Sequence, residues 1–110
     1  MIKTTRAFVA LAAILAATSA HAANLAAGKE KAQEVCQACH GMDGLSVAYP
    51  EYPKIGGQHR DYLAKALRDY KAGVRKNPIM GAMAQPLTAQ DIDNITEYYA
   101  KQPGPLRSLY

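Results

Sequence analysis

Both cysteines of the chain lie in the stretch EVCQACHGMDG, residues 34–44, and a histidine directly follows the second of them. Cys36 and Cys39 are three residues apart, which places both side chains on one face of a helix. His40 adds an imidazole next to these two sulfur atoms. These residue types at this spacing are compatible with four chemistries: a disulfide, a thiol redox centre, part of a zinc site, or a covalent haem attachment.

Three of these chemistries fit the rest of the sequence poorly. A structural zinc site needs about four ligands, but residues 23–110 offer Cys36, Cys39, His40 and His59, and His40 is adjacent to Cys39. A thioredoxin-like dithiol starts a helix beside a βαβ pattern, whereas these cysteines end a predicted helix and no strand pattern is present. A disulfide would close a very small loop and leave the histidine and two long loops unexplained.

A covalent haem explains all of these features. Cysteines one helical turn apart can each form a thioether with a vinyl group of the porphyrin, and the next histidine can bind the iron. The pattern Cys-x-x-Cys-His is typical of c-type haem attachment because it fixes residue type, spacing and order. We therefore predict one covalent haem c with its iron, attached through Cys36 and Cys39 and ligated by His40.

A second axial ligand has to come from a distant part of the chain. Met42 is too close to His40 to reach the opposite face of a haem, which leaves Met80, Met83 and His59. The two later methionines are three residues apart, so both cannot bind one iron, and one of them is expected to fill space in the core. Spacing alone does not choose among the three candidates.

The elements that position these residues are predicted to be helical. Apolar residues recur with a helical period from about 26 to 39, from 59 to 73, and from 88 to the residue before Pro103. The second segment carries an apolar stripe made of Tyr62, Leu63, Ala66, Leu67 and Tyr70.

Local signals mark the ends of these helices. Gly73 is predicted to end the second helix, and Thr88 with Asp91 is predicted to form a capping box at the start of the third. Residues 41–58 and 74–87 show no strand pattern and are predicted loops. The predicted fold is all-α, with long loops that line a site.

The N-terminal residues have the features of an export signal. Lys3 and Arg6 precede an apolar run, and AHA at residues 20–22 has the small residues that a signal peptidase reads. Residues 1–22 are therefore predicted to be a secretory signal peptide, too short for a stable membrane span. Residues 23–110 are predicted to be one periplasmic domain.

A chain of this size buries only roughly 60–65% of its unfolded surface, which favours a cofactor as an additional source of stability.

Charge indicates the kind of partner. The chain has a formal charge of +4, and two of its 13 basic residues but none of its 9 acidic ones precede residue 23, which leaves +2 for residues 23–110. A value this close to neutral does not favour nucleic acid. Basic residues concentrate in the middle third, which indicates a solvated face or a docking surface for an acidic partner. The basic residues of the middle third are Lys54, Arg60, Lys65, Arg68, Lys71, Arg75 and Lys76. In the segment after Asn77, Asp91, Asp93 and Glu97 stand without an adjacent basic residue.

From residue 28 to residue 100 the chain resembles a bacterial class I cytochrome c, and more narrowly a single domain of the cytochrome c-four type. The resemblance rests on CQACHGMDG, YPKIGGQHRDYLAKALRDYKAGVR and NPIMGAMAQPLTAQDIDNITEYYA. It implies the class I fold, in which helices and long loops wrap around one covalently bound haem c. It also implies that the first and last helices cross, with Gly28 against Tyr98 or Tyr99.

The resemblance further implies roles for individual residues. Met80, the first methionine of the Met-x-x-Met pair, is the expected second axial ligand, with Met83 as second choice. Met83 is otherwise expected to point toward the body of the domain. The Pro53 carbonyl is expected to accept a hydrogen bond from the ligand histidine, which would fix the ring and raise its basicity.

Two polar residues match positions near a haem propionate. Gln58 follows two glycines, and Arg75 precedes the methionine segment. For Arg75 an equally good interpretation is that its charge favours the negative end of the second helix.

The resemblance implies an electron carrier rather than an enzyme, in which a haem c with histidine and methionine ligands moves one electron between redox partners. Docking would be transient and at the haem edge. The alternatives are a haem subunit or domain of a redox enzyme complex, and a gas-binding haem protein. Proteins of the c-four type have two haem domains, and this chain has one Cys-x-x-Cys-His, so both a monomer and a homodimer are compatible with the sequence.

Overall fold

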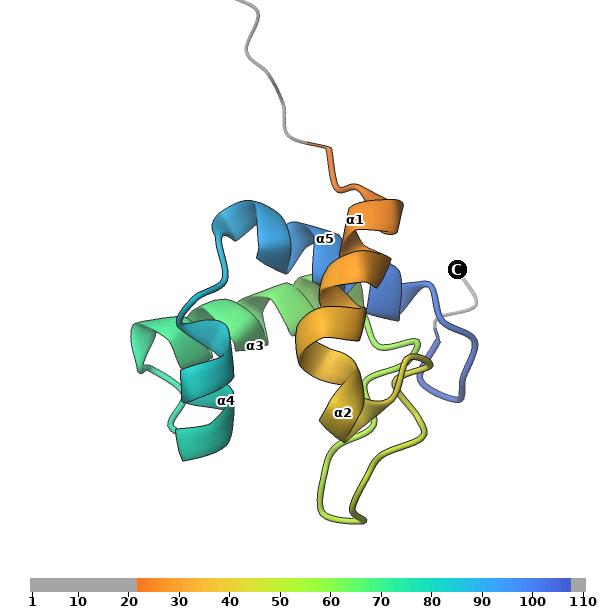
Figure 1. Cartoon of the computed structure of the whole chain (residues 1–110), viewed down its shortest axis with the longest axis horizontal. Coiled ribbons are helices and arrows are strands. Elements are labelled where there is room, and N and C mark those ends of the chain that lie inside the picture. The colour runs from red at the N-terminus through yellow and green to blue at the C-terminus, as the bar shows by residue number, and fades with distance from the viewer. Residues whose placement is uncertain (1–21, 108–110) are drawn as a thin grey trace, which may run out of the picture.

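The computed structural model describes residues 22–107, in which all regular elements are helices and no β-strand is present (Figure 1). This confirms the predicted all-α fold. The predicted signal peptide, apart from Ala22, lies outside the described residues. The elements are α1 (Leu25–Lys31), η1 (Ala32–Cys36), α2 (Gln37–His40), α3 (Arg60–Ala72), α4 (Pro78–Ala84) and α5 (Ala89–Ala100).

The first predicted helix is one helical path with a wide π-helical turn in its middle. Asn24 caps α1 by accepting a hydrogen bond from the backbone N–H of Ala27 at 3.1 Å. The wide turn is η1, and it ends at Cys36. Such turns are rare and often occur at functional sites. The sequence pattern predicted the helix but not this turn, which lies between α1 and α2.

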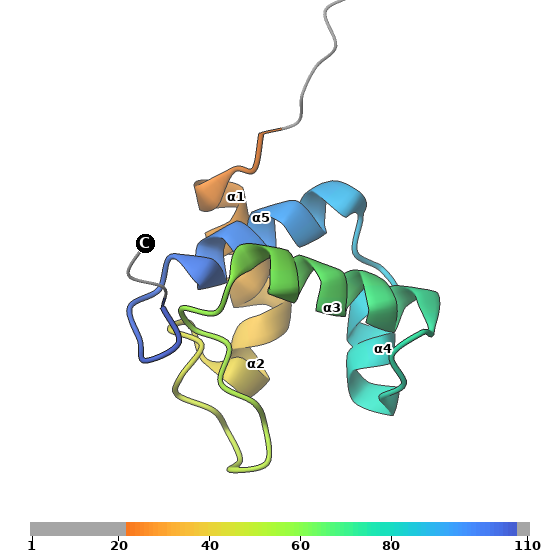
Figure 2. The same ribbon diagram turned by 180° about the vertical axis from the view of Figure 1, so that it is seen from behind.

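The helices α1 and α5 cross at close range, as Figures 1 and 2 show. Gly28 is buried at the crossing, where a Cβ atom would lie 2.0 Å from the backbone oxygen of Asn94 and 3.1 Å from the Cβ of Tyr98. The Asn94 side chain accepts a hydrogen bond from the backbone N–H of Asn24 at 2.8 Å. The expected crossing of the first and last helices is confirmed, with Tyr98 as the aromatic residue that faces Gly28.

Helix α3 packs across α5 and ends as predicted at Gly73, whose φ of +74° belongs to the left-handed region. Ion pairs join the two helices: Arg60 Nε lies 3.1 Å from Glu97 Oε2, and Arg68 Nη2 lies 2.9 Å from Asp93 Oδ1. Glu97 also pairs with Lys101 one helical turn later in sequence, with Nζ 2.9 Å from Oε1. Asp93 and Glu97, which have no adjacent basic residue in the sequence, thus have basic partners in the structure. The charges of α3 and α5 are therefore largely neutralised along their shared outer face.

The segment 74–87, predicted as a loop, contains the short helix α4. Asn77 caps it by accepting hydrogen bonds from the backbone N–H groups of Ile79 at 3.0 Å and Met80 at 2.9 Å, and Pro78 occupies the first turn. An asparagine followed by proline is a known helix start, but the helix is too short for its periodicity to show in the sequence. The Gln85 side chain donates to the backbone oxygen of Lys71 at 2.8 Å, which connects this segment to the end of α3.

The hydrophobic core lies between the first helical path, α3 and α5. The predicted capping box starts α5: the Asp91 N–H donates to Thr88 Oγ1 at 3.0 Å, and the Thr88 N–H donates to Asp91 Oδ2 at 2.9 Å. Half of the core cluster comes from α5, because its apolar residues recur on one face. The cluster is Ala32, Leu63, Ala64, Leu87, Ile92, Ile95, Tyr98 and Tyr99.

Candidate haem site

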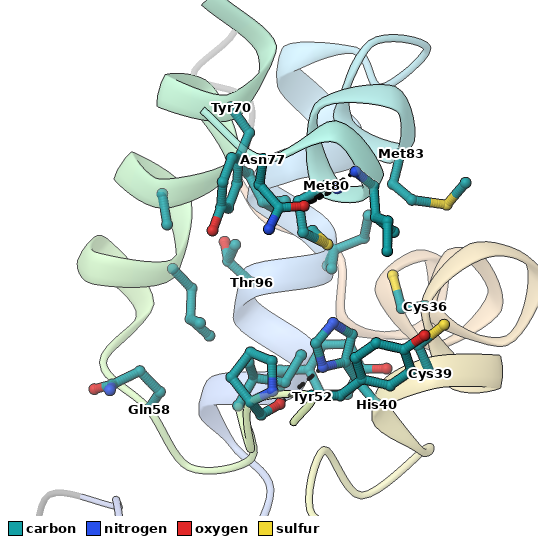
Figure 3. Close-up of a pocket in the computed structure, with 18 of the residues that line it drawn as sticks. Cys36, Cys39, His40, Tyr52, Gln58, Tyr70, Asn77, Met80, Met83 and Thr96 are labelled. Carbon is teal, nitrogen blue, oxygen red and sulfur yellow. Dashed lines mark hydrogen bonds between the residues drawn. The ribbon is translucent and has the colours of Figure 1, made fainter. Parts of the chain in front are cut away.

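A cavity of about 470 Å³ lies between α2, α3, α4, α5 and the loop that precedes α3. Its volume is in the range of small-molecule and cofactor sites. Figure 3 shows most of the side chains that line it. The lining includes the complete stripe predicted for α3, namely Tyr62, Leu63, Ala66, Leu67 and Tyr70. The stripe therefore forms a wall of the cavity, and Leu63 also belongs to the core.

Cys36 and Cys39 come from η1 and α2, and both line this cavity as half-buried side chains that are not joined to each other. Burial raises the pKa of the Cys36 thiol to about 11, against a weaker opposing effect of Lys31. A nucleophilic redox cysteine has a lowered pKa instead, so this environment is unlike that of a reactive dithiol. Within residues 22–107, no three side chains among His, Cys, Asp and Glu gather in a way that could bind a metal.

His40 is the last residue of α2, and Gly41 ends the helix with a φ of +76°. The imidazole is 8% exposed, and its Nδ1 lies 2.9 Å from the backbone oxygen of Pro53. A carbonyl oxygen can only accept a hydrogen bond, so Nδ1 carries a proton, and in the neutral ring the lone pair is on Nε2. The contact expected from the resemblance is present, and it gives His40 the tautomer that a metal ligand needs.

The two candidate methionines lie on α4, and they point in different directions (Figure 3). The Met80 sulfur points into the cavity, toward the side on which His40 lies, and the side chain is half-buried. Met83 also contributes to the cavity lining, but its sulfur points away from the cavity, and this side chain is 43% exposed. The expectation that Met83 packs against the body of the domain is therefore wrong. The reason is that α4 lies at the periphery, where Ala84 is its buried residue.

The remaining predicted residues lie at the edge of the cavity or outside it. Gln58 lines the cavity, and its Oε1 accepts a hydrogen bond from the His59 N–H at 2.8 Å. Arg75 also lines it, with its guanidinium 4.9 Å from the ring centroid of Tyr70 and Nη1 3.5 Å from the hydroxyl of Tyr62. His59 is exposed at the start of α3 and lies outside this lining, which makes it the weakest of the three candidate axial ligands.

Two tyrosines next to the cavity have contacts that sequence reasoning missed. The Tyr98 hydroxyl donates to the backbone oxygen of Met42 at 2.7 Å, and the Tyr99 hydroxyl donates to that of Gly41 at 2.9 Å. Burial raises the pKa of both hydroxyls, so each keeps its proton and acts as a donor. The pair YY is visible in the sequence, but nothing local predicts that both side chains reach the segment just after His40.

The residues present fit a covalent haem c. Two thiols one turn apart are the groups that attach c-type haem, and an imidazole with an unbonded Nε2 and a thioether on the other side are donors of the kind that its iron uses. They lie on the walls of one cavity whose remaining lining is mainly apolar or aromatic. The polar side chains Gln58 and Arg75 are part of the same lining.

This chain is similar to several known proteins, among them the following three. Cytochrome c4 of Thiocapsa roseopersicina is 48% identical over 77 residues, which cover 70% of this chain and 39% of that protein. Cytochrome c-554(548) of Halomonas halodenitrificans is 42% identical over 84 residues, which cover 74% of this chain and 99% of that protein. The crystal structure of reduced recombinant cytochrome c4 from Pseudomonas stutzeri matches with a TM-score of 0.68 and 40% identity, over 76% of this chain and 47% of that one.

The chain thus spans less than half the length of these two cytochrome c4 relatives, 39% and 47%, but nearly all of the cytochrome c-554(548). The family model of cytochrome c matches residues 25–102, which include every element of the described fold. The resemblance inferred from the sequence is confirmed: the chain belongs to the cytochrome c family, whose members bind haem c and its iron covalently.

Proposed function

We propose that this protein is a periplasmic electron carrier that uses His40 and Met80 as axial ligands of a single haem c. The observation that carries the proposal is the position of these two side chains, which point into one apolar cavity from different elements, beside both cysteines. When bound, haem c supplies an iron that changes between Fe(II) and Fe(III). The protein residues attach it, tune it and protect it from water.

Each protein residue has a separate task in this proposal. Cys36 and Cys39 fix the porphyrin by two thioether bonds. The hydrogen bond from His40 Nδ1 to the Pro53 carbonyl orients the ring and increases the basicity of Nε2. Met80 supplies a thioether, a weak donor that favours the reduced state and so raises the reduction potential relative to two histidines.

A site with both axial positions filled by side chains leaves no position for a substrate. For this reason we favour an electron carrier over an enzyme or a gas-binding protein. The α3 stripe and the aromatic residues of the cavity keep water away from the site. The same arrangement would serve in a free carrier and in a domain of a larger redox protein.

The surface around the cavity suits a transient redox partner. Ile79 is 53% exposed beside the exposed Met83, and both line the cavity. Lys54 and Arg75 are exposed at the same cavity, Lys76 follows in the chain, and Glu51 is the acidic residue among them. The bases of α3 that face α5 are paired, so the positive charge left near the cavity favours an acidic partner. A small apolar contact inside a charged rim is typical of brief electron-transfer encounters.

The periplasmic location is proposed from the predicted signal peptide, residues 1–22. The relatives reported above are bacterial proteins. In the part of the chain that the structure describes, no helix combines the length and the apolar character needed to cross a membrane.

Absorption spectra of the full-length holoprotein in both oxidation states test the proposal. We expect the spectrum of a low-spin haem c, a sulfur-to-iron band in the ferric state, and no binding of added cyanide within minutes. A ferric protein that lacks the band and binds cyanide at once would contradict the carrier and support a gas-binding or catalytic site.

A further inference from the structure

Tyr99 contacts both chain segments that flank the hydrogen bond between His40 and Pro53. Its hydroxyl donates to the backbone oxygen of Gly41, the residue after His40, at 2.9 Å. Its own backbone oxygen accepts a hydrogen bond from the N–H of Gly57, also at 2.9 Å. The side chain is 1% exposed and lines the cavity. One residue of α5 therefore connects the segment after the histidine to the segment after the proline.

The same two segments are in direct contact with each other and with the Tyr99 ring. The backbone oxygen of Gly44 accepts hydrogen bonds from the N–H groups of Ile55 at 2.8 Å and Gly56 at 2.9 Å. A Cβ atom on Gly44 would lie 2.5 Å from the Gly56 nitrogen and 2.9 Å from Cδ1 of Tyr99. The three parts are thus packed without space for even one methyl group.

We propose that Tyr99 is a positioning residue for His40, because it fixes residues 41–44 and 55–57 at the separation at which His40 Nδ1 and the Pro53 oxygen form their hydrogen bond. The length of that hydrogen bond controls the basicity of Nε2 toward a bound metal. The inference rests on the proposed function in that it takes His40 as the iron ligand. It adds a residue that does not itself touch the iron.

Tyr98 provides a matched control on the neighbouring position. Its hydroxyl also donates to a backbone oxygen, that of Met42 at 2.7 Å, and its ring is also buried. The two rings pack edge to face with centroids 5.2 Å apart. Tyr98 differs from Tyr99 in two contacts. Its hydroxyl donates to the backbone oxygen of Met42, one residue farther along the chain from His40 than Gly41. Its backbone oxygen accepts a hydrogen bond from the Gln102 side chain rather than from the N–H of Gly57. A phenylalanine at either position removes one hydroxyl and keeps the ring.

The experiment compares Tyr99→Phe with Tyr98→Phe in the full-length holoprotein. Three quantities are measured: the solvent exchange rate of the His40 Nδ1 proton by NMR in the ferrous state, the reduction potential, and the melting temperature. For Tyr99→Phe we expect exchange to accelerate several-fold and the potential to rise, because a less basic imidazole stabilises Fe(III) less. For Tyr98→Phe we expect a similar loss of melting temperature with exchange and potential unchanged.

Any other pattern overturns the inference. If Tyr99→Phe lowers only the melting temperature, Tyr99 is a core residue without a positioning role. If both variants change exchange and potential to the same extent, the effect comes from general packing of α5. This test is separate from the test of the proposed function. If Met80 is not a ligand, the sulfur-to-iron band is missing in the unmodified protein. The exchange rate of the Nδ1 proton reports on His40 alone.

Discussion

The two sides of the haem cavity are built differently. On the His40 side, the loop after α2 is fixed by Tyr98 and Tyr99 from α5 and by the hydrogen bond to the Pro53 oxygen. On the Met80 side, α4 packs chiefly on the end of α3, and most of its residues are exposed. One proposed axial ligand, His40, is therefore buried and held by residues of α5, and the other lies on a peripheral helix. We expect changes on the His40 side to affect folding, and changes on the Met80 side to affect the iron with less effect on folding.

The largest effect is expected from removal of both cysteines. In Cys36→Ala/Cys39→Ala the haem loses its covalent attachment, and the apolar walls of a cavity of about 470 Å³ lose the cofactor that they pack against. We expect almost no holoprotein. We also expect the protein to be unfolded already at 25 °C, so that heating produces no cooperative unfolding transition. Absorbance of the purified protein and thermal melting by circular dichroism measure the two outcomes. A double variant that melts cooperatively without haem would show that the cofactor is not needed for the fold.

The next effect is expected from Met80→Ala on the peripheral side. Loss of the thioether should abolish the sulfur-to-iron band, lower the reduction potential and allow cyanide to bind the ferric protein. The fold should persist, because α4 contributes Ala84 rather than Met80 to the buried residues. Spectra, a redox titration and a melting curve test this prediction. An unchanged band would exclude Met80 as the ligand and direct attention to Met83 or His59.

Two glycines test the contrast in packing directly. Gly28→Ala places a Cβ 2.0 Å from the Asn94 backbone oxygen at the crossing of α1 and α5. This change should lower the unfolding free energy by about 1–3 kcal/mol. Gly81→Ala in α4 meets no heavy atom within 4 Å, and should add about 0.5–1 kcal/mol because alanine favours the helix. Denaturant titrations of the two holoprotein variants measure both values. If Gly81→Ala lowers the unfolding free energy as much as Gly28→Ala does, the proposed contrast between the packing of the two sides is wrong.

The caps of α5 and α4 should respond differently to acid. Hydrogen bonds from Thr88 lower the pKa of Asp91 against the opposing effect of burial, whereas the Asn77 cap does not titrate. A lowered folded-state pKa means that Asp91 stabilises the fold above the unfolded value of about 3.9, and that this contribution disappears as pH falls through the lower folded value. The stability difference between the wild type and Asp91→Asn should therefore shrink below about pH 4. A difference that stays constant from pH 7 to pH 3 would contradict this assignment.

The sequence predicted those parts of the molecule that depend on local spacing. The Cys-x-x-Cys-His order specifies its chemistry within five residues, and the capping box of α5 within four. By contrast, α4 is too short to show a helical period, and the π-helical turn of η1 has no distinct sequence pattern. The contacts of Tyr98 and Tyr99 join residues more than 50 positions apart. Such contacts follow from how the helices pack, which one sequence alone does not specify.

The smallest effect is expected from Met83→Leu. Because the side chain is 43% exposed and its sulfur points away from the cavity, leucine should change the unfolding free energy by less than about 0.5 kcal/mol, as at most surface positions. The sulfur-to-iron band should remain, since the Met80 sulfur points toward the side of the cavity on which His40 lies and the Met83 sulfur points in another direction. The ferric spectrum and a melting curve of Met83→Leu, recorded beside those of Met80→Leu, measure this. Loss of the band in Met83→Leu alone would require α4 to rotate when haem is bound and would make Met83 the ligand.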